Sequence, residues 1–337
     1  MKFSEERKKN IIEYILTKID EGVDGISHIA AETFGISQST VHVYLNELKD
    51  KGIIKKGSRD KYFLVSEKYT YELSREKGEL KSEDAIFDAY IAPIIKDCPE
   101  NVKTIWVYAF TEMVNNVIDH SQAEKLFIEI EKNYLKTEVN ILDDGIGAFK
   151  KIQNHFGYPT LEDAVIELAK GKLTTDNVHH SGEGIFFTSR VMDTFILCSD
   201  HKIFSFNKYS EQMLADIKNE TEFGTWVCLA LSNSSLKRLF DIFNEYSDVD
   251  NGFTKTRIPL KNIFETAPVS RSQAKRIGSR LEQFKEVEID FDGIEYLGQG
   301  FAHEMFFVFA CAHPEIKLTP LNMNKTVETM YLHTKAR

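Results

Sequence analysis

The stretch between Phe110 and Asp193 constrains the fold more than any other part of the chain, because it holds three short motifs in close order. The motifs read FTEMVNNVIDH from residue 110, DDGIG from residue 143 and SGEGI from residue 181. Each motif contains an apolar run or lies next to one, and each also contains acids, amides or glycines. A packed element therefore meets a polar segment or a tight turn. Together the motifs predict a ligand pocket.

The first motif predicts a buried helix with one polar edge. Its apolar stripe comprises Phe110, Met113, Val114 and Val117, and its polar edge comprises Glu112, Asn116, Asp119 and His120. Because Glu112 and Asn116 are one helical turn apart, a carboxylate and an amide oxygen reach the same space. This pairing suits a general base beside a Mg²⁺ ligand, since Mg²⁺ prefers a few hard oxygen ligands and keeps several waters.

The second and third motifs predict two glycine-rich turns. Asp143 follows an apolar run and precedes a turn that Gly145 and Gly147 permit. An acid at such a strand end can accept a hydrogen bond from an adenine amino group. Gly182 and Gly184 precede a helical pattern, and glycines at a helix entrance let backbone N–H groups approach phosphate closely.

In order and spacing, these motifs resemble those of the GHKL ATPase superfamily, which includes gyrase, MutL, the histidine kinases and the anti-sigma-factor serine kinases. Gly224 and Thr225, which enter the strand pattern 226–231, look like the last motif of that family. The resemblance spans about residues 82–235 and implies an α+β sandwich, with helices over one face of a mixed sheet and with ATP and Mg²⁺ as ligands. Taken singly, each motif also fits an ordinary amphipathic helix or a glycine turn.

The resemblance also implies a role for each residue at the phosphate end of the pocket. Glu112 would polarise the attacking water or hydroxyl, and Asn116 would hold Mg²⁺. Gly182 and Gly184 would approach the phosphates. Lys172 lies in the segment KGKLTT, where the family has its mobile ATP lid, and is the candidate for a phosphate contact there.

At the other end of the pocket, the resemblance implies an adenine site. Asp143 would bind the adenine, with Gly145 and Gly147 shaping the turn around it. Thr225 would support the adenine side.

Composition narrows the class of protein further. At 337 residues the chain has room for two or three domains, and its net charge of −10 argues against a general affinity for nucleic acid. The longest apolar run, 305–312, is too short to span a membrane, and the first residues do not form a signal peptide, so a cytoplasmic location without membrane contact is expected. The scattered cysteines argue against a zinc site, and the sequence holds no P-loop motif.

Residues 1–65 predict a small domain of helices and a hairpin, with helices at 5–20, 27–34 and 37–51 and a hairpin at 53–65. The arrangement resembles a winged helix-turn-helix, in which the third helix enters the DNA major groove and the wing touches phosphate. Six basic and three acidic residues between 37 and 65 give this surface a net charge of +3. The candidate DNA-binding residues are Gln38, Ser39, His42, Asn46, Lys55, Lys56 and Arg59. A winged helix can instead serve protein contact or dimerisation, and that alternative stays open.

The last part of the chain predicts a small α/β layer: a helix at 270–284, a strand at 286–291, a glycine loop, a helix at 301–312, a strand at 316–321 and a helix at 325–334. This order resembles the STAS fold of anti-sigma-factor antagonists, and more closely a STAS-like domain often placed after a GHKL module. The loop 297–300 has no Ser or Thr, so the phosphoacceptor of the antagonists is missing, and His303 is interpreted as a structural or interface residue.

We therefore expect an α+β multidomain chain with a winged helix at 1–65, a linker at 66–81, a GHKL ATP-binding domain at 82–252 and a STAS-like domain at 253–337. The polar segment 66–81 can instead be the first edge of the next domain, and that alternative stays open. The leading hypothesis is a DNA-binding transcriptional regulator that binds Mg–ATP and hydrolyses it slowly to switch domain association. The first alternative is a serine/threonine protein kinase of the anti-sigma-factor type acting on a separate STAS-like partner. A nucleotide-gated scaffold is the third. Expected partners are DNA, a protein bound through the STAS-like domain and a second copy of the chain.

Overall fold

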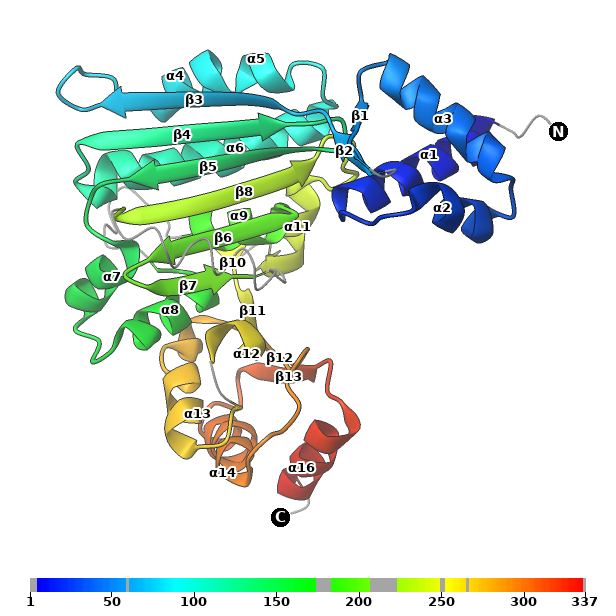
Figure 1. Cartoon of the computed structure of the whole chain (residues 1–337). Helices are drawn as coiled ribbons and strands as arrows, with labels where there is room; N and C mark the ends of the chain where they lie inside the picture. Colours follow the sequence, from blue (N-terminus) through cyan, green and yellow to red (C-terminus); the bar gives the residue numbers. More distant parts are fainter. Residues whose placement is uncertain are drawn as a thin grey trace.

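The computed structural model describes residues 5–58, 61–173, 183–206, 223–248, 252–264 and 267–335. Three units follow one another along the chain: a helical unit, a six-stranded sheet with helices, and a layer built on a three-stranded sheet (Figure 1). The expected α+β class is therefore confirmed. Over these described residues, no helix combines the length and the apolar character that crossing a bilayer requires.

The N-terminal unit packs three helices and a hairpin around a small core of its own. Its elements are α1 (Glu5–Asp20), α2 (Ile26–Phe34), α3 (Gln38–Asp50), β1 (Ile54–Lys56) and β2 (Tyr62–Leu64). Ser37 caps α3, because its hydroxyl accepts a hydrogen bond from the Thr40 N–H at 3.2 Å. Ile11, Ile15 and Val41 are fully buried between the helices. The elements expected for this segment are present, and its resemblance to a DNA-binding domain stays a prediction.

The central unit is built on a sheet with the strand order β3-β4-β5-β8-β6-β7. These strands are β3 (Glu67–Ser74), β4 (Lys125–Lys132), β5 (Lys136–Asp143), β6 (Thr194–Ser199), β7 (Lys202–Ser205) and β8 (Thr225–Ser232). Among the described residues the pairings are antiparallel, rather than the mixed arrangement expected for this unit. Short turns join β4 to β5 and β6 to β7, which makes those neighbours antiparallel. The parallel pairs lie in the C-terminal sheet.

The segment 66–81, expected to be a linker or the first edge of the next domain, contributes the edge strand β3 of this sheet, in agreement with the second alternative. It pairs with β4 along its whole length. Leu73 is buried in the core, and Tyr69 and Tyr71 pack against that core from the same face of the strand. The alternate residues are polar and lie on the other face, which is why the segment reads as a linker in the sequence.

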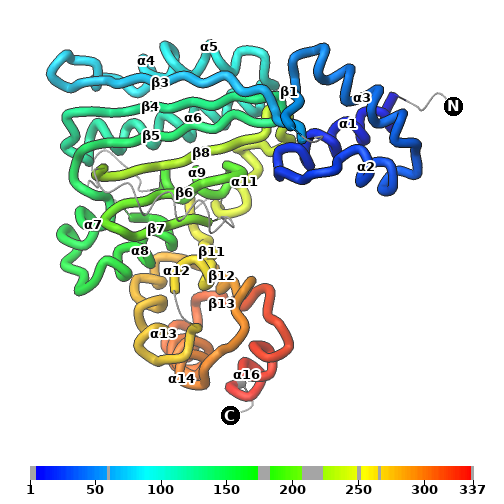
Figure 2. Tube along the Cα trace, viewed as in Figure 1, coloured from blue at the N-terminus to red at the C-terminus, as the bar shows by residue number. Residues whose placement is uncertain are grey.

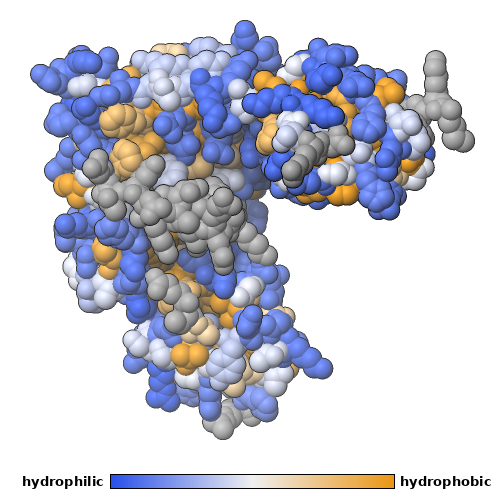
Figure 3. All heavy atoms as spheres, in the orientation of Figure 1, coloured by the Kyte–Doolittle hydropathy of each residue, from blue (hydrophilic) through white to orange (hydrophobic). Residues whose placement is uncertain are grey.

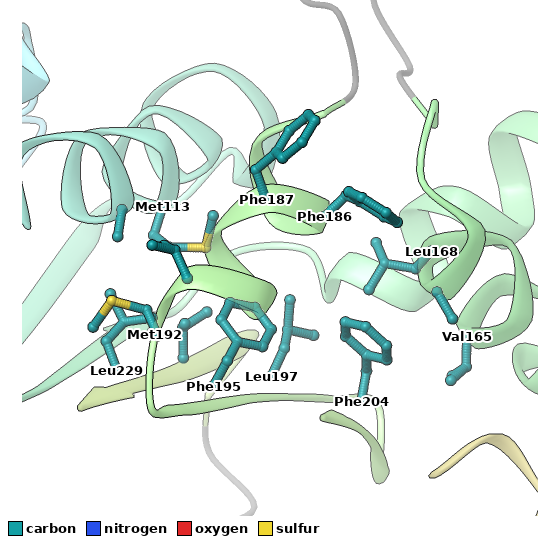
Figure 4. Close-up of a cluster of buried hydrophobic side chains, with 14 of the residues drawn as sticks. Met113, Val165, Leu168, Phe186, Phe187, Met192, Phe195, Leu197, Phe204 and Leu229 are labelled. Carbon is teal, nitrogen blue, oxygen red and sulfur yellow. The ribbon is translucent and has the colours of Figure 1, made fainter. Parts of the chain in front are cut away.

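Helices cover one face of the sheet (Figure 1). They are α4 (Glu83–Tyr90), α5 (Ala92–Ile95), α6 (Glu100–Asn115) with a π-helical turn (Asn116–Ser121), α7 (Ala148–Phe156), α8 (Leu161–Lys170), α9 (Gly184–Val191) and α11 (Leu239–Tyr246). Trp106 and Phe110 of α6 are fully buried in the core they share with the sheet. Figure 4 shows a part of this core in which Met113 of α6, Leu168 of α8 and Phe187 of α9 gather over the strands.

The C-terminal unit is a parallel sheet with the order β11-β12-β13 and helices. Its elements are β11 (Lys255–Pro259), α12 (Leu260–Ile263), α13 (Arg271–Gly278), a single 3₁₀ turn (Leu281–Gln283), β12 (Glu286–Asp290), α14 (Gln299–His303), a π-helical turn (Glu304–Phe309), α15 (Ala310–Ala312), β13 (Lys317–Leu321) and α16 (Lys325–Lys335). The two-residue strands β9 (Ser247–Asp248) and β10 (Gly252–Phe253) precede it. The helix expected at 270–284 is shorter: α13 ends at Gly278, because Ser279 has a non-helical ψ of 132°, and Arg280 then adopts a left-handed φ of 58°.

The N-terminal and C-terminal units attach to different parts of the central unit (Figure 2). Leu135, just before β5, packs against the N-terminal core, and the Lys136 ammonium lies 3.1 Å from the Asp20 carboxylate. The C-terminal unit instead contacts α8. Figure 3 shows open space between the two outer units on the face in view.

Candidate functional site

A cavity of about 390 Å³ lies between the helices and the sheet, at the end of β5. Its lining comes from α6 and the π-helical turn, from β5, β6 and β8, and from α7, α8 and α9. Of the site residues predicted from the sequence, the lining includes Glu112, Asn116, Asp143, Gly184 and Thr225. Segments far apart in the sequence therefore meet at one cavity, as the three motifs predict.

The motif helix changes geometry at the cavity. Regular α-helix ends at Asn115, and the π-helical turn that follows begins at Asn116. Such turns are wider than an α-helix and occur often at functional sites. Met113 and Val117 are buried, while Glu112 and Asn116 stay partly exposed. The helix is therefore fixed by its buried face and presents the Glu112 carboxylate and the Asn116 amide to the cavity.

Asp143 is a buried acid at the end of β5, only 3% exposed. Its Oδ1 accepts a hydrogen bond from the Gly145 N–H at 2.8 Å, and Thr225 lies opposite it on β8. Burial raises the pKa of the Asp143 carboxyl to about 7, although the bond from Gly145 opposes that shift. The side chain is thus an oriented acceptor whose charge state changes near neutral pH.

Gly145 brings the DDGIG turn against the end of the motif helix. A Cβ built at this position would overlap the carbonyl oxygen of Ser121 and the backbone of Ala123. The Ile146 N–H donates to the same Ser121 oxygen at 2.7 Å. Gly145 therefore serves backbone packing beside the cavity, and neither it nor Gly147 is part of the described lining.

Replacing Gly145 by Ala is expected to lower the free energy of unfolding by about 3 kcal/mol, because two backbone segments must separate to admit the methyl group. Urea denaturation of the wild type and the variant measures the change. Gly22→Ala is the comparison, since Gly22 has a φ of 73° with open space around it and its replacement carries only the left-handed strain of about 1 kcal/mol. Equal losses in the two variants would contradict the packing account.

Gly184 is the first residue of α9 and lies directly against Glu112. A Cβ at Gly184 would overlap the Glu112 carboxylate. Gly184, which is predicted to approach phosphate, therefore also leaves the space that the Glu112 carboxylate occupies.

Besides Gly145, two described site residues, Gly147 and Lys172, are not part of the cavity lining. A Cβ at Gly147 would overlap Asp200, whose carboxylate accepts the Lys150 N–H at 3.0 Å near the start of α7. The Lys172 ammonium donates to the Gln283 carbonyl at 2.9 Å, so Lys172 contacts the C-terminal unit instead of a phosphate position. Its amine also lies over two aromatic rings, those of Phe253 and Phe284. Gly182 lies outside the described residues.

Sequence reasoning missed several polar residues of the lining: Asn115, Ser121 and Lys151, together with His120, which was placed on the polar edge without a role. The Lys151 ammonium donates to the His120 carbonyl at 2.6 Å and so joins α7 to the π-helical turn. The signal was present, because Ala148, Lys151 and Ile152 follow the DDGIG turn at the spacing of one helix face.

The residues predicted to contact DNA lie on α3 and β1. Gln38, Ser39 and Asn46 are exposed on α3, and His42 is half-buried. Lys55 and Lys56 are exposed on β1, with the Lys56 ammonium 5.9 Å from the centre of the Tyr62 ring. Arg59 lies outside the described residues. The described candidates form an accessible polar and basic surface.

One family model matches the chain. A STAS-like domain of unknown function (DUF4325) matches residues 273–328, from α13 to α16. This confirms the STAS-like C-terminal domain expected from the strand and helix order. A search of curated proteins finds no match to the chain.

Proposed function

We propose that this chain is an ATP-binding regulator whose central unit binds Mg–ATP and hydrolyses it slowly. The observation that carries the proposal is the shared cavity of Glu112, Asn116 and Asp143. The GHKL resemblance assigns these residues to catalysis, Mg²⁺ and adenine. Two of them come from a helix and the third from a strand end, so their convergence depends on the fold and supports the resemblance independently of the motifs.

The cavity suits a nucleotide in size and in lining. Its volume of about 390 Å³ lies within the range of about 300–1,000 Å³ that is usual for ligand pockets. Ile141, Ile152 and Val227 provide apolar walls for a flat base, with Asp143 as the acceptor for its amino group. Asn116 offers an amide oxygen of the kind that Mg²⁺ prefers, and bound Mg²⁺ would neutralise phosphate charge.

The remaining roles belong to the chain's own groups. Glu112 would take a proton from the attacking water, and its carboxylate lies against Gly184 at the start of α9. The first N–H groups of α9, beginning at Gly184, would face the phosphate end. Thr225 would support the adenine side beside Asp143.

The N-terminal unit is proposed to bind DNA as a winged helix. Support comes from the exposed side chains on α3 and from Lys55 and Lys56 on the hairpin. The segment 37–65 carries a net +3 in a chain of net −10, so the positive charge is local. A second copy of the chain would supply the paired half-site contact that such domains use.

The turnover proposal is tested by incubating the purified chain with Mg²⁺ and γ-labelled ATP and separating free phosphate from protein-bound label. Slow release of free phosphate is the expected result. Label retained on this chain or on an added STAS-like protein would instead identify a protein kinase. Absence of turnover with ATP still bound would leave a nucleotide-gated scaffold.

A kinase acting on a separate partner is the second candidate function. The match to a STAS-like domain favours it, because kinases of the anti-sigma-factor type work with STAS partners. In this chain the loop 297–300 has no Ser or Thr, so the acceptor would be on another molecule. Glu112 would then deprotonate a hydroxyl group instead of water.

Replacing Lys55 and Lys56 by Ala is expected to weaken DNA binding equally for different sequences and to reduce the salt slope by about one unit for each phosphate that the two lysines neutralise. Fluorescence polarisation at several salt concentrations measures the slope. Lys68→Ala is the control, because Lys68 is an exposed lysine of β3 that lies outside the N-terminal unit. An unchanged slope in the double variant would remove the hairpin from the DNA surface.

A further inference from the structure

Helix α8 is shared between the cavity and the STAS-like unit. Leu168 of α8 lines the cavity together with Phe186 of α9, and both side chains lie in the core shown in Figure 4. Two residues further along, Lys170 points away from the cavity lining and contacts the STAS-like unit. Leu173, just after α8, lines the cavity again. The helix thus carries cavity wall and domain contact within one turn.

The Lys170 contact is fully desolvated. Its ammonium is 0% exposed and donates to the Ser279 carbonyl at 2.6 Å and to the Arg276 carbonyl at 3.1 Å, at the end of α13. Glu167, one turn earlier on α8 and 4% exposed, neutralises the charge at 2.5 Å. From β11, the Thr256 hydroxyl donates to the Lys170 carbonyl at 2.7 Å. A buried charge with this set of partners has no low-energy alternative position, so α8 is held in one place relative to α13.

A second layer of contacts surrounds Lys170. The Arg276 guanidinium of α13 pairs with Asp163, in the first turn of α8. Arg280 donates to the Tyr158 hydroxyl at 3.3 Å, and Lys172 donates to the Gln283 carbonyl. Both ends of α8 are therefore attached to one short segment of the STAS-like unit.

The N-terminal unit has no comparable contact with the cavity wall among the described residues. It meets the central unit at Leu135 and Lys136, where β5 begins, whereas Asp143 lies where β5 ends. The whole strand separates the two. The N-terminal unit therefore meets β5 at the end far from the cavity, whereas the STAS-like unit contacts α8 at Lys170, two residues from the lining residue Leu168.

We infer that the STAS-like unit regulates the nucleotide site of its own chain by holding α8, with Arg276 as a positioning residue that acts through Asp163. The inference rests on the proposed function, since it requires that the cavity bind a nucleotide. By holding α8, the STAS-like unit fixes the position of the cavity wall that Leu168 and Leu173 form, so docking and nucleotide binding favour each other. By linkage, the nucleotide must strengthen the docking by the same factor as docking strengthens the nucleotide.

The test is the variant Arg276→Gln in the full-length chain, with Mg–ATP affinity measured by displacement of a fluorescent ATP analogue. Arg276 is distant in sequence from the cavity residues and belongs to the STAS-like unit, so a loss of affinity reports coupling. We expect binding to weaken by about fivefold. Arg276→Lys, which keeps the charge, is expected to restore most of the affinity.

Lys136→Gln is the matched control. It removes a partly exposed ion pair at the other domain contact, with side-chain exposure of 39% against 31% for Arg276. Its ATP affinity is expected to equal that of the wild type. Hydrogen exchange supplies the reciprocal readout: Mg–ATP is expected to slow exchange in α13 of the wild type, and a purely structural role of Arg276 would not produce that effect.

Two results would overturn the inference. If exchange in α13 of Arg276→Gln is faster while ATP binds as tightly as in the wild type or more tightly, the two sites are not coupled in the way described. If Mg–ATP leaves exchange in α13 of the wild type unchanged, reciprocity fails. Failure of the wild type to bind ATP at all is distinguishable from both, because it would remove the proposed function together with this inference.

Discussion

Replacement of Asp143 by Asn is expected to weaken ATP binding by at least about 100-fold, which makes it the most damaging single change in the adenine site. The carboxylate offers only acceptors, and one of its oxygens is already oriented by the Gly145 N–H at 2.8 Å. If the Asn carbonyl keeps that bond, its NH₂ group faces the amino group of adenine, and two donors meet in a buried position. Displacement of a fluorescent ATP analogue measures the loss.

Asp144→Asn is the control for this substitution. Asp144 is the exposed neighbour of Asp143, and its Oδ1 accepts the Glu124 and Lys125 N–H groups at 2.9 Å outside the cavity lining. An Asn at this position can accept the same bonds, so ATP affinity is expected to stay within about twofold of the wild type. Equal losses in the two variants would mean that the turn, and not the Asp143 carboxylate, supports binding.

The pH dependence gives a second measurement on the same residue. Burial raises the pKa of Asp143 to about 7 from its ordinary value of 3.8. Because the folded state binds this proton more tightly than the unfolded state, the contribution of Asp143 to the free energy of unfolding is fully present below about pH 3.8. That contribution is lost as the pH rises through about 7. In the same pH range ATP affinity is expected to rise, since the ionised carboxylate is the stronger acceptor. Asp143→Asn is expected to lose the part of both pH dependences, that of stability and that of ATP affinity, which comes from the Asp143 carboxyl. The titration of ATP itself is the same for both proteins, so the difference between the wild-type and variant pH profiles reports the Asp143 side chain alone.

Replacement of Glu112 by Gln is expected to lower the rate of phosphate release by about 10²–10⁴-fold while ATP affinity is retained. The amide fills the same space against Gly184 but cannot take a proton. Release of labelled phosphate under saturating ATP measures the effect, and displacement of the fluorescent analogue shows that the site is still filled.

Glu100→Gln is the matched control for the Glu112 variant. Glu100 begins the same helix and is 88% exposed, in an ion pair with Lys103 far from the cavity. Turnover is expected to match the wild type. Wild-type turnover in Glu112→Gln would instead assign the base to a different residue and remove the main catalytic element of the proposal.

The parts of the fold that sequence predicts are those in which local pattern and packing agree. The stripe through Phe110, Met113 and Val117 makes a helix that must be buried, and its period also fixes the side from which Glu112 and Asn116 emerge. Glu112 and Asn116 come close to Asp143 because the end of β5 lies under that helix. The STAS-like unit was predictable for a similar reason, since its alternating strands and helices leave few arrangements.

The parts that sequence leaves open or misassigns depend on long-range contacts. The segment containing β3 has a polar appearance because half of its residues face away from the core, and only pairing with β4 makes it a strand. Lys172 resembles a lid lysine in sequence, but the Gln283 carbonyl and the Phe253 and Phe284 rings hold it at the domain contact. The requirement for glycine at position 145 comes from the close approach of the Ser121 backbone, which belongs to a different element.

The most direct test of the central claim is isothermal titration calorimetry of Mg–ATP into the wild-type chain, with GTP and Mg²⁺-free ATP titrated in parallel. The account predicts one ATP per chain, weaker binding without Mg²⁺ and much weaker binding of GTP, since Asp143 accepts from the amino group of adenine and GTP places a carbonyl there. No heat of binding with ATP, at protein concentrations that would detect a millimolar dissociation constant, would contradict it. Equal affinity for ATP and GTP would contradict the assignment of Asp143.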